Sequence, residues 1–503
     1  MASFWIISLI TVIIISVLQS LLKPAKKKKL PPGPMGLPII GHFHLLGKNP
    51  NEDLYRLAQK YGPIMYMRFG SMPTVLVSSP AAAELFLKTH DLNFASRSPH
   101  EASKYISYEQ RNMAFAKYGT YWRDMRKLST LELFSGLKVR QFQPMRRTEV
   151  RLMVESLKPA AERGETVDMS LKSAAIVGDI MNLTVFGRKF GDNDLDHEKG
   201  FKEVLTATMA EAAAINIVDF FPYLKWLNLL GASRRIKNLA KKYDKFVTRI
   251  IDDHLQSEER KGKNGDFVDT MMAIVESGEA GFEFDSRNVK AVLLDMILAG
   301  TDTAASAVEW TLSEIIKNPM VMKRLQKELE EVVGMDQLVE ESHLPNLKYL
   351  ECVVKESLRI HPPVLLLPHS SIEDCEVDGY YIPGGTRTLI NIWAIGRDPV
   401  AWPNPEKFDP DRFVDSKVDL RGHDFHLLPF GSGRRGCPGL QLGLVVIQYV
   451  VAQLVHCFDW ELPNQMSPDQ LDMSEHYGLV SCRATHLMAI PTYRIRDQTK
   501  TTS

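Results

Sequence analysis

A single cysteine in a glycine-rich loop is the residue of this sequence best suited to do chemistry. The segment Phe430–Gly439 reads FGSGRRGCPG, and an apolar helix is predicted to start directly after it. Glycine allows positive φ angles and a close approach of the backbone to a flat ligand. The first N–H groups of the helix and the charges of Arg434 and Arg435 favour a thiolate at Cys437. One thiolate without neighbouring ligands suits haem iron better than zinc, so we predict Cys437 as a metal ligand, with an inert buried cysteine as the alternative.

A second group of reactive side chains interrupts an apolar stretch at Ala299-Gly300-Thr301-Asp302-Thr303. An acid and two hydroxyls inside a buried helix are costly unless they are used. We interpret them as an oxygen-binding notch, in which Thr303 hydrogen-bonds dioxygen, Asp302 feeds protons inward, and Gly300 lets a ligand approach or lets the helix widen. The alternative is a kink whose hydroxyls bond back to the preceding turn.

Helices must position both groups. A helix capped at Asp285 is predicted to run to Asn318, about 33 residues or roughly 50 Å, with its apolar first half buried through the core. Further helices are predicted over Leu344–Arg359 and Leu440–Phe458, whereas strand-like runs such as Ile64–Phe69 and Tyr380–Ile382 are short. The expected fold class is therefore mainly α with small β-sheets, in a single large helical domain.

The loop around Cys437 carries a resemblance to a known family. The pattern Phe-x-x-Gly-x-Arg-x-Cys-x-Gly is the haem-binding signature of the cytochrome P-450 family, and its fixed positions are filled by Phe430, Gly433, Arg435, Cys437 and Gly439. The resemblance runs from about residue 31 to residue 494, and its details are most similar to plant endoplasmic-reticulum (microsomal, A-type) members. It implies the cytochrome P-450 fold and a haem b cofactor. One departure is residue 304, an alanine where many relatives carry a second hydroxyl.

The resemblance also implies which side chains bind the haem. Haem carboxylates need cationic or N–H donors. The implied cofactor-binding residues are Trp122, Arg126, Arg97, His369, Phe430, Arg435 and Gly439. The alternative for each charged residue among them is an ordinary solvated surface charge.

An ion pair is expected on the helix predicted over Leu344–Arg359. Glu356 and Arg359 are spaced i, i+3 and share a face. The resemblance adds Arg412 and implies a buried structural ion triad behind the haem, which fixes the ligand loop. A surface pair contributing little is the alternative.

The N-terminus is predicted to be a membrane anchor. Phe4–Leu22 is mostly apolar and roughly 29 Å long as a helix, and lysines follow it at 23 and 26–29. Positive charge stays on the cytosolic side, so we expect a single-pass protein of the endoplasmic reticulum membrane whose catalytic domain faces the cytosol. The predicted divisions are an anchor (1–22), a basic and Pro-rich linker (23–38) and a haem-thiolate catalytic domain (39–503). A cleavable signal peptide, the alternative, carries its charge before the apolar run.

Composition restricts the possible partners. The formal net charge is zero, so no global field favours nucleic acid, and the five cysteines are too widely spaced for a disulfide framework. The chain has no dinucleotide fingerprint or flavin domain. By resemblance, NADPH acts only indirectly, through an NADPH–cytochrome reductase on the same membrane.

The predicted reaction is the insertion of one oxygen atom from O2 into a small apolar substrate. Leu294, Ile297, Ala299 and the run 364–366 are expected to form an apolar wall around it. The substrate is expected to be a plant specialised metabolite, with terpenoids, alkaloids and phenolics all open. The alternatives are an oxygen-independent rearrangement enzyme of the same fold and a non-catalytic haem or electron-carrier protein.

Overall fold

The computed structural model describes residues 28–190, 201–213, 216–227, 232–257 and 262–495. The predicted anchor over Phe4–Leu22 lies outside the described residues. Within them, three helices are long and apolar enough to cross a membrane, namely α9 (Met169–Phe186), α14 (Ser286–Lys317) and α18 (Leu440–Cys457). Half or more of each is buried inside the protein, so these helices build its core.

Helices make up most of the described chain, as predicted. The helices besides those three are α2 (Pro50–Tyr61), α3 (Pro80–Glu84), α4 (Asp91–Phe94), α5 (Glu101–Ile106), α6 (Thr120–Glu132), α7 (Gly136–Gln141), α8 (Gln143–Arg163), α10 (Phe201–Ala213), α11 (Ile217–Phe220), α12 (Ala232–Gln256), α13 (Phe267–Ser277), α15 (Pro319–Val333), α16 (Lys348–Ile360) and α17 (Ile392–Ile395). Short 3-10 helices join several of them, among them η6 (Glu341–Asn346) and η8 (Gly433–Arg435).

The strands form small sheets. The largest has the order β1-β2-β7-β4, in which β2 and β7 are parallel and the other pairs antiparallel. A second sheet has the order β3-β11-β8, and two further pairs join β9 to β10 and β5 to β6. The strands are β1 (Ile64–Phe69), β2 (Met72–Val77), β3 (Val167–Asp168), β4 (Leu366–Ser370), β5 (Cys375–Val377), β6 (Tyr380–Ile382), β7 (Arg387–Asn391), β8 (Phe458–Glu461), β9 (Glu475–His476), β10 (Cys482–Arg483) and β11 (Met488–Tyr493).

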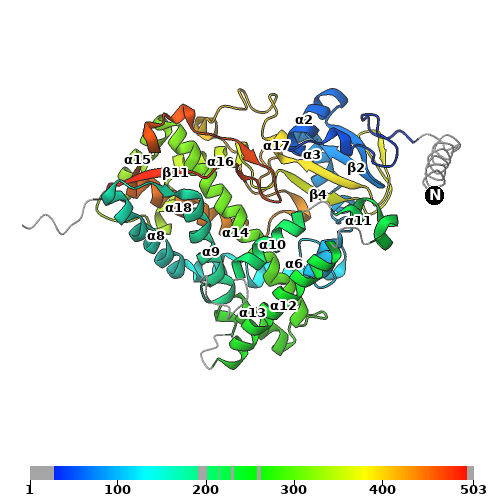
Figure 1. Cartoon of the computed structure of the whole chain (residues 1–503), viewed down its shortest axis with the longest axis horizontal. Helices are drawn as coiled ribbons and strands as arrows, with labels where there is room; N and C mark the ends of the chain where they lie inside the picture. Colours follow the sequence, from blue (N-terminus) through cyan, green and yellow to red (C-terminus); the bar gives the residue numbers. More distant parts are fainter. Residues whose placement is uncertain (1–27, 191–200, 214–215, 228–231, 258–261, 496–503) are drawn as a thin grey trace, which may run out of the picture.

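The two kinds of structure separate in space. The sheet containing β2 and β4 lies at one end of the molecule with α2, α3 and α17, and α8, α15, α16 and α18 gather at the other end (Figure 1). Helix α14 lies between them and packs against α9, α13, α16 and α18. The haem-ligand loop predicted from the sequence leads directly into α18.

Helix α14 confirms the long helix predicted from the sequence. The Asp285 side chain accepts hydrogen bonds from the backbone N–H groups of Arg287 and Asn288, and the Asn288 side chain bonds back to complete a capping box. The helix ends at Lys317, because Pro319 starts α15. The helix predicted from Leu344 begins only at Lys348, since Pro345 belongs to the 3-10 turn η6.

Candidate active site

A cavity lies where α6, α9, α14 and the start of α18 meet. Its volume is about 220 Å³. Most of the site residues predicted from the sequence line it. These are Arg97, Trp122, Arg126, Thr303, Phe430, Arg435, Cys437 and Gly439.

Cys437 is accessible from the cavity, and its own backbone N–H donates to the Phe430 carbonyl oxygen (2.8 Å). The surrounding protein keeps this environment poorly solvated. Burial raises the pKa of the Cys437 thiol, although a hydrogen bond from the Gly439 N–H and the charge of Arg126 act to lower it. Desolvation of the sulfur therefore opposes the contributions of the loop, and the thiolate at Cys437 stays a prediction. A metal bound to the sulfur would favour the deprotonated form.

The glycines before Cys437 are needed for the shape of the loop. Gly433 has a φ of 66°, and a Cβ atom there would lie 2.6 Å from the Leu87 carbonyl oxygen. The next residue, Arg434, forms an ion pair with Asp91. Arg434 thus holds the loop against the segment 87–91. Arg126, rather than Arg434, supplies the positive charge that acts on the sulfur.

Three guanidinium groups line the cavity. Burial lowers the pKa of Arg126, lowers that of Arg97 to about 10, and together with the charges of Arg97 and Arg126 lowers that of Arg435 to about 8. Asp295 is the one carboxylate among the lining residues that the structure describes. An excess of buried positive charge of this kind is suited to an anionic ligand with more than one carboxylate.

Two residues predicted to bind the cofactor, Trp122 and His369, differ in their position relative to the cavity. The Trp122 ring lines the cavity, its indole N–H donates to the Met113 carbonyl oxygen (3.0 Å), and the Arg435 guanidinium lies 4.1 Å from the ring centre. His369 is buried in β4, its Nδ1 is bonded to the Phe94 carbonyl oxygen (2.9 Å), and it is not among the residues that line the cavity. Burial and the charge of Arg97 lower the pKa of His369 to about 3.

Thr303 brings a hydroxyl to the cavity wall, where it donates to the Ala299 carbonyl oxygen one turn earlier (2.6 Å). Helix α14 remains α-helical through this region, so the widening expected at Gly300 is not present. A Cβ atom at Gly300 would lie 2.4 Å from the Met181 side chain, so the glycine also allows α9 and α14 to approach. Asp302 is not among the lining residues, and burial raises the pKa of its carboxyl.

The comparison with protein families agrees with this geometry. The family model described as cytochrome P-450 matches residues 31–487. The chain belongs to the cytochrome P-450 family. It is 48% identical over 483 residues to cytochrome P-450 CYP736A12 of Panax ginseng, with 94% of this chain and 96% of the relative covered. It is also 41% identical to a flavonoid 3'-monooxygenase of Arabidopsis thaliana (93% and 92% covered) and 40% identical to a flavonoid 3',5'-hydroxylase of Solanum melongena (97% and 96% covered).

Members of the cytochrome P-450 family bind haem b, and the residues of the cavity fit this cofactor. Cys437 provides a soft sulfur ligand, Arg97, Arg126 and Arg435 provide charge for the propionates, and apolar side chains such as Val446 form the wall between them. The chain is therefore a haem-thiolate monooxygenase, as the family and its monooxygenase relatives establish.

The three residues expected to form an ion triad lie together. The Arg359 guanidinium donates to both Glu356 carboxylate oxygens (2.7 and 2.8 Å), and Arg412 Nε donates to Glu356 Oε1 (2.9 Å). The Asp409 backbone N–H adds a further bond to the same carboxylate (2.8 Å). Glu356 and Arg359 are fully buried, so this is not the surface pair that was the alternative.

Sequence reasoning missed Asp295. This buried acid on α14 lines the cavity, and burial raises its pKa to about 6. A signal was available, since Asp295 is an acid inside an apolar helix and lies eight positions before Thr303, on the same helical face. The predicted apolar wall is only partly correct, because Ala299 lines the cavity whereas Leu294 and Ile297 are buried in the core.

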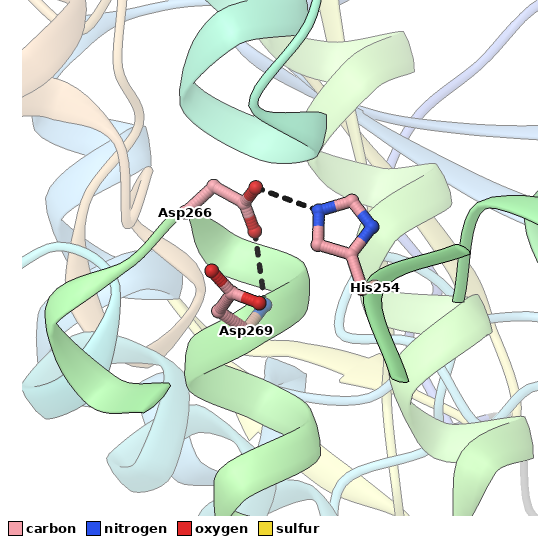
Figure 2. A group of neighbouring side chains, drawn as sticks. All are labelled: His254, Asp266 and Asp269. Carbon is pink, nitrogen blue, oxygen red and sulfur yellow. Dashed lines mark hydrogen bonds and ion pairs between the residues drawn. The ribbon is translucent and has the colours of Figure 1, made fainter. Parts of the chain in front are cut away.

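A second group of titratable side chains lies apart from the cavity, between the end of α12 and the start of α13. The His254 ring and the Asp266 carboxylate face one another (Nε2 to Oδ2, 2.8 Å), and the Asp269 N–H donates to the other Asp266 oxygen (Figure 2). The ammonium of Lys138 sits nearby and donates to the Gly265 carbonyl oxygen (2.9 Å). A cation already occupies these surroundings, so we interpret the group as an ion cluster that joins the two helices.

Proposed function

We propose that this chain inserts one oxygen atom from O2 into a hydrophobic plant metabolite at the cavity beside Cys437. The observation that carries the proposal is that a single cavity is lined by Cys437, by the arginines and by the hydroxyl of Thr303. The overall reaction is RH + O2 + NADPH + H⁺ → ROH + H2O + NADP⁺.

Each residue around the sulfur has a proposed task. Cys437 would be the axial ligand, and the Gly439 N–H would keep a hydrogen bond on its sulfur. The haem propionates would be bound by Arg97, Arg126 and Arg435. Each guanidinium group donates some of its N–H groups to backbone carbonyl oxygens, and the remaining N–H groups would bind the propionates. The Phe430 ring would pack on the face of the ligand loop, and the triad of Glu356, Arg359 and Arg412 would hold the chain behind it. Trp122 would orient Arg435, and His369 would act at longer range through Arg97.

The haem, when bound, would supply the iron for oxygen activation, and the Cys437 sulfur would push electron density toward it and so favour cleavage of the O–O bond. Thr303 would hold a proton at its Oγ1, which now faces the Ala299 carbonyl oxygen, and rotation of the side chain would turn it toward the cavity. Asp302 would replenish that proton from solvent, and its raised pKa suits a group that both takes up and releases protons. Met113, Val177 and Met181 would exclude water around the substrate.

The redox partner and the membrane complete the proposal. A family member requires a reductase and a small hydrophobic substrate, and we propose an NADPH–cytochrome reductase as the donor. We also propose a single-pass anchor over residues 4–22 in the endoplasmic reticulum membrane, with the catalytic domain in the cytosol, since the lysines after the apolar run favour that orientation. Among the lining residues described there is no histidine, which weighs against an electron carrier with a second strong haem ligand.

The test is expression of the full chain with a plant reductase in microsomes, fed with phenolics, terpenes and alkaloids. We place phenolics first, because several relatives are flavonoid hydroxylases. One of the three substrate classes should give a product with one added oxygen atom, and formation of this product should require NADPH. Cys437→Ala should abolish the product and the thiolate-type carbon-monoxide spectrum. Thr303→Ala should keep the spectrum, lower the product yield roughly tenfold or more and release peroxide instead. If Thr303→Ala forms product normally, the hydroxyl does not have the proposed role.

A further inference from the structure

Asp295 makes a concentrated set of contacts to one irregular segment. Its Oδ1 accepts a hydrogen bond from Asn112 Nδ2 (2.6 Å). Its Oδ2 accepts the backbone N–H groups of Met113 (2.7 Å) and Ala114 (3.1 Å). The carboxylate is buried and belongs to the rigid core helix α14, so it can hold this segment from outside.

The carbonyl groups of the same segment hold the cations of the cavity. The Met113 carbonyl oxygen accepts Arg435 Nη1 (2.9 Å) as well as the indole N–H of Trp122. The Ala114 carbonyl oxygen accepts Arg97 Nε (2.9 Å). The backbone around Met113 and Ala114 therefore lies between a carboxylate on its N–H side and two guanidinium groups on its C=O side. Such a chain of hydrogen bonds strengthens each of its members.

The segment has little structure of its own to fix these carbonyls. The residues 107–119 belong to no helix or strand. Tyr108, Glu109 and Gln110 have φ angles of 51°, 64° and 65°, which are unfavourable for residues other than glycine. A strained, irregular backbone holds its position only when its surroundings determine it. Asp295 fixes this segment and itself lines the cavity.

We propose that Asp295 is a positioning residue for the haem propionates: its carboxylate sets the place of Met113 and Ala114, and their carbonyl groups in turn set the place of Arg435 and Arg97. The proposal rests on the proposed function, in which those arginines bind the propionates. Burial raises the pKa of the Asp295 carboxyl, and the three N–H donors and Arg435 act in the opposite direction. The same contacts that position the segment thus also favour the charged form that it needs.

The test compares Asp295→Asn with the wild-type holoenzyme. An amide keeps one acceptor oxygen but turns an NH2 group toward N–H donors, so the segment should shift. We expect haem to transfer to excess apomyoglobin roughly 10-fold to 100-fold faster. The propionate bending bands in the resonance Raman spectrum should shift, whereas the carbon-monoxide spectrum of the haem still bound should match the wild type, because Cys437 is unchanged. Asp295→Glu, which keeps the charge, should recover part of the haem retention.

Glu309→Gln is the matched control, because Glu309 is another buried carboxylate of α14 and lies away from the cavity lining. The proposal would be overturned if Asp295→Asn transferred haem at the wild-type rate. It would also be overturned if Glu309→Gln transferred haem as fast as Asp295→Asn. If Asp295→Asn does not fold, Asn112→Ala decides, since it removes one donor and should give a smaller change in the same direction. If the wild-type protein itself lacks the thiolate-type spectrum, the proposed function is wrong. That outcome differs from a failure of the Asp295 proposal, in which the wild-type spectrum is present.

Discussion

Two clusters of charged side chains, the triad around Glu356 and the arginines of the cavity, differ in how their charges are paired. In the triad, the Glu356 carboxylate forms ion pairs with both Arg359 and Arg412 and also accepts a backbone N–H, so each charged group contacts a partner of opposite charge. In the cavity, Arg97, Arg126 and Arg435 form no ion pair with the residues that the structure describes, and their lining holds a single carboxylate. Charge that is paired within the chain supports the fold, whereas guanidinium groups without a paired carboxylate mark the place of an anionic ligand. The difference separates the structural part of the site from the cofactor-binding part.

Breaking the ion pairs of the triad should have the largest effect. Glu356→Gln leaves two guanidinium groups without their carboxylate, and we expect a loss of about 3–5 kcal/mol in the free energy of unfolding. Because the triad does not depend on the cofactor, thermal unfolding should show the loss in the haem-loaded and in the haem-free protein alike.

The control for this change is Glu331→Gln. Glu331 pairs with Lys327 on the surface and is 67% exposed, so its loss should change stability by less than about 0.5 kcal/mol. A Glu356→Gln protein destabilised only when haem is bound would show that the triad belongs functionally to the cavity, and the contrast between the two clusters would fail.

Removing one of the unpaired arginines of the cavity should affect cofactor binding rather than the fold. Within the described residues, the Arg126 guanidinium donates one hydrogen bond, to the Gly436 carbonyl oxygen (2.7 Å). Arg126→Gln should therefore cost the haem-free protein only about 1 kcal/mol, but should weaken haem binding by about 1.5–3 kcal/mol, since a charged hydrogen bond to a propionate is lost. Haem titration and haem-free thermal unfolding measure the two quantities. Arg123→Gln, an exposed change on the same helix, should alter neither.

The sequence could predict features whose partners lie close together along the chain. The pair Glu356 and Arg359 is one helical turn apart, and the loop before Cys437 carries its own glycines. Helix α14 was predictable for the same reason, because its cap, its apolar run and the proline after it are all local.

Features that need distant segments could not be read in this way. Asp295 meets Asn112 and Met113 across more than 180 residues, and no local pattern connects them. Arg434 and Arg435 are neighbours, yet one pairs with Asp91 outside the cavity and the other turns toward it. The surroundings of Cys437 were only partly predictable, because helix dipoles can be read from sequence, whereas the desolvation of the sulfur comes from the packing of several helices.

The pair of His254 and Asp266 gives the smallest and most selective test of the rule that charge paired within the chain stabilises the fold. Asp266 raises the pKa of His254 above its usual 6.5, so protonated His254 stabilises the folded state below that pH, and the contribution, on the order of 1 kcal/mol, is lost as the pH rises through the folded pKa. His254→Gln should thus lower the melting temperature near pH 5.5 and have little effect near pH 9. His486→Gln, which removes a more exposed histidine paired with Asp168, should show a weaker form of the same dependence. An equal loss at both pH values would mean that His254 contributes through packing and not through its charge.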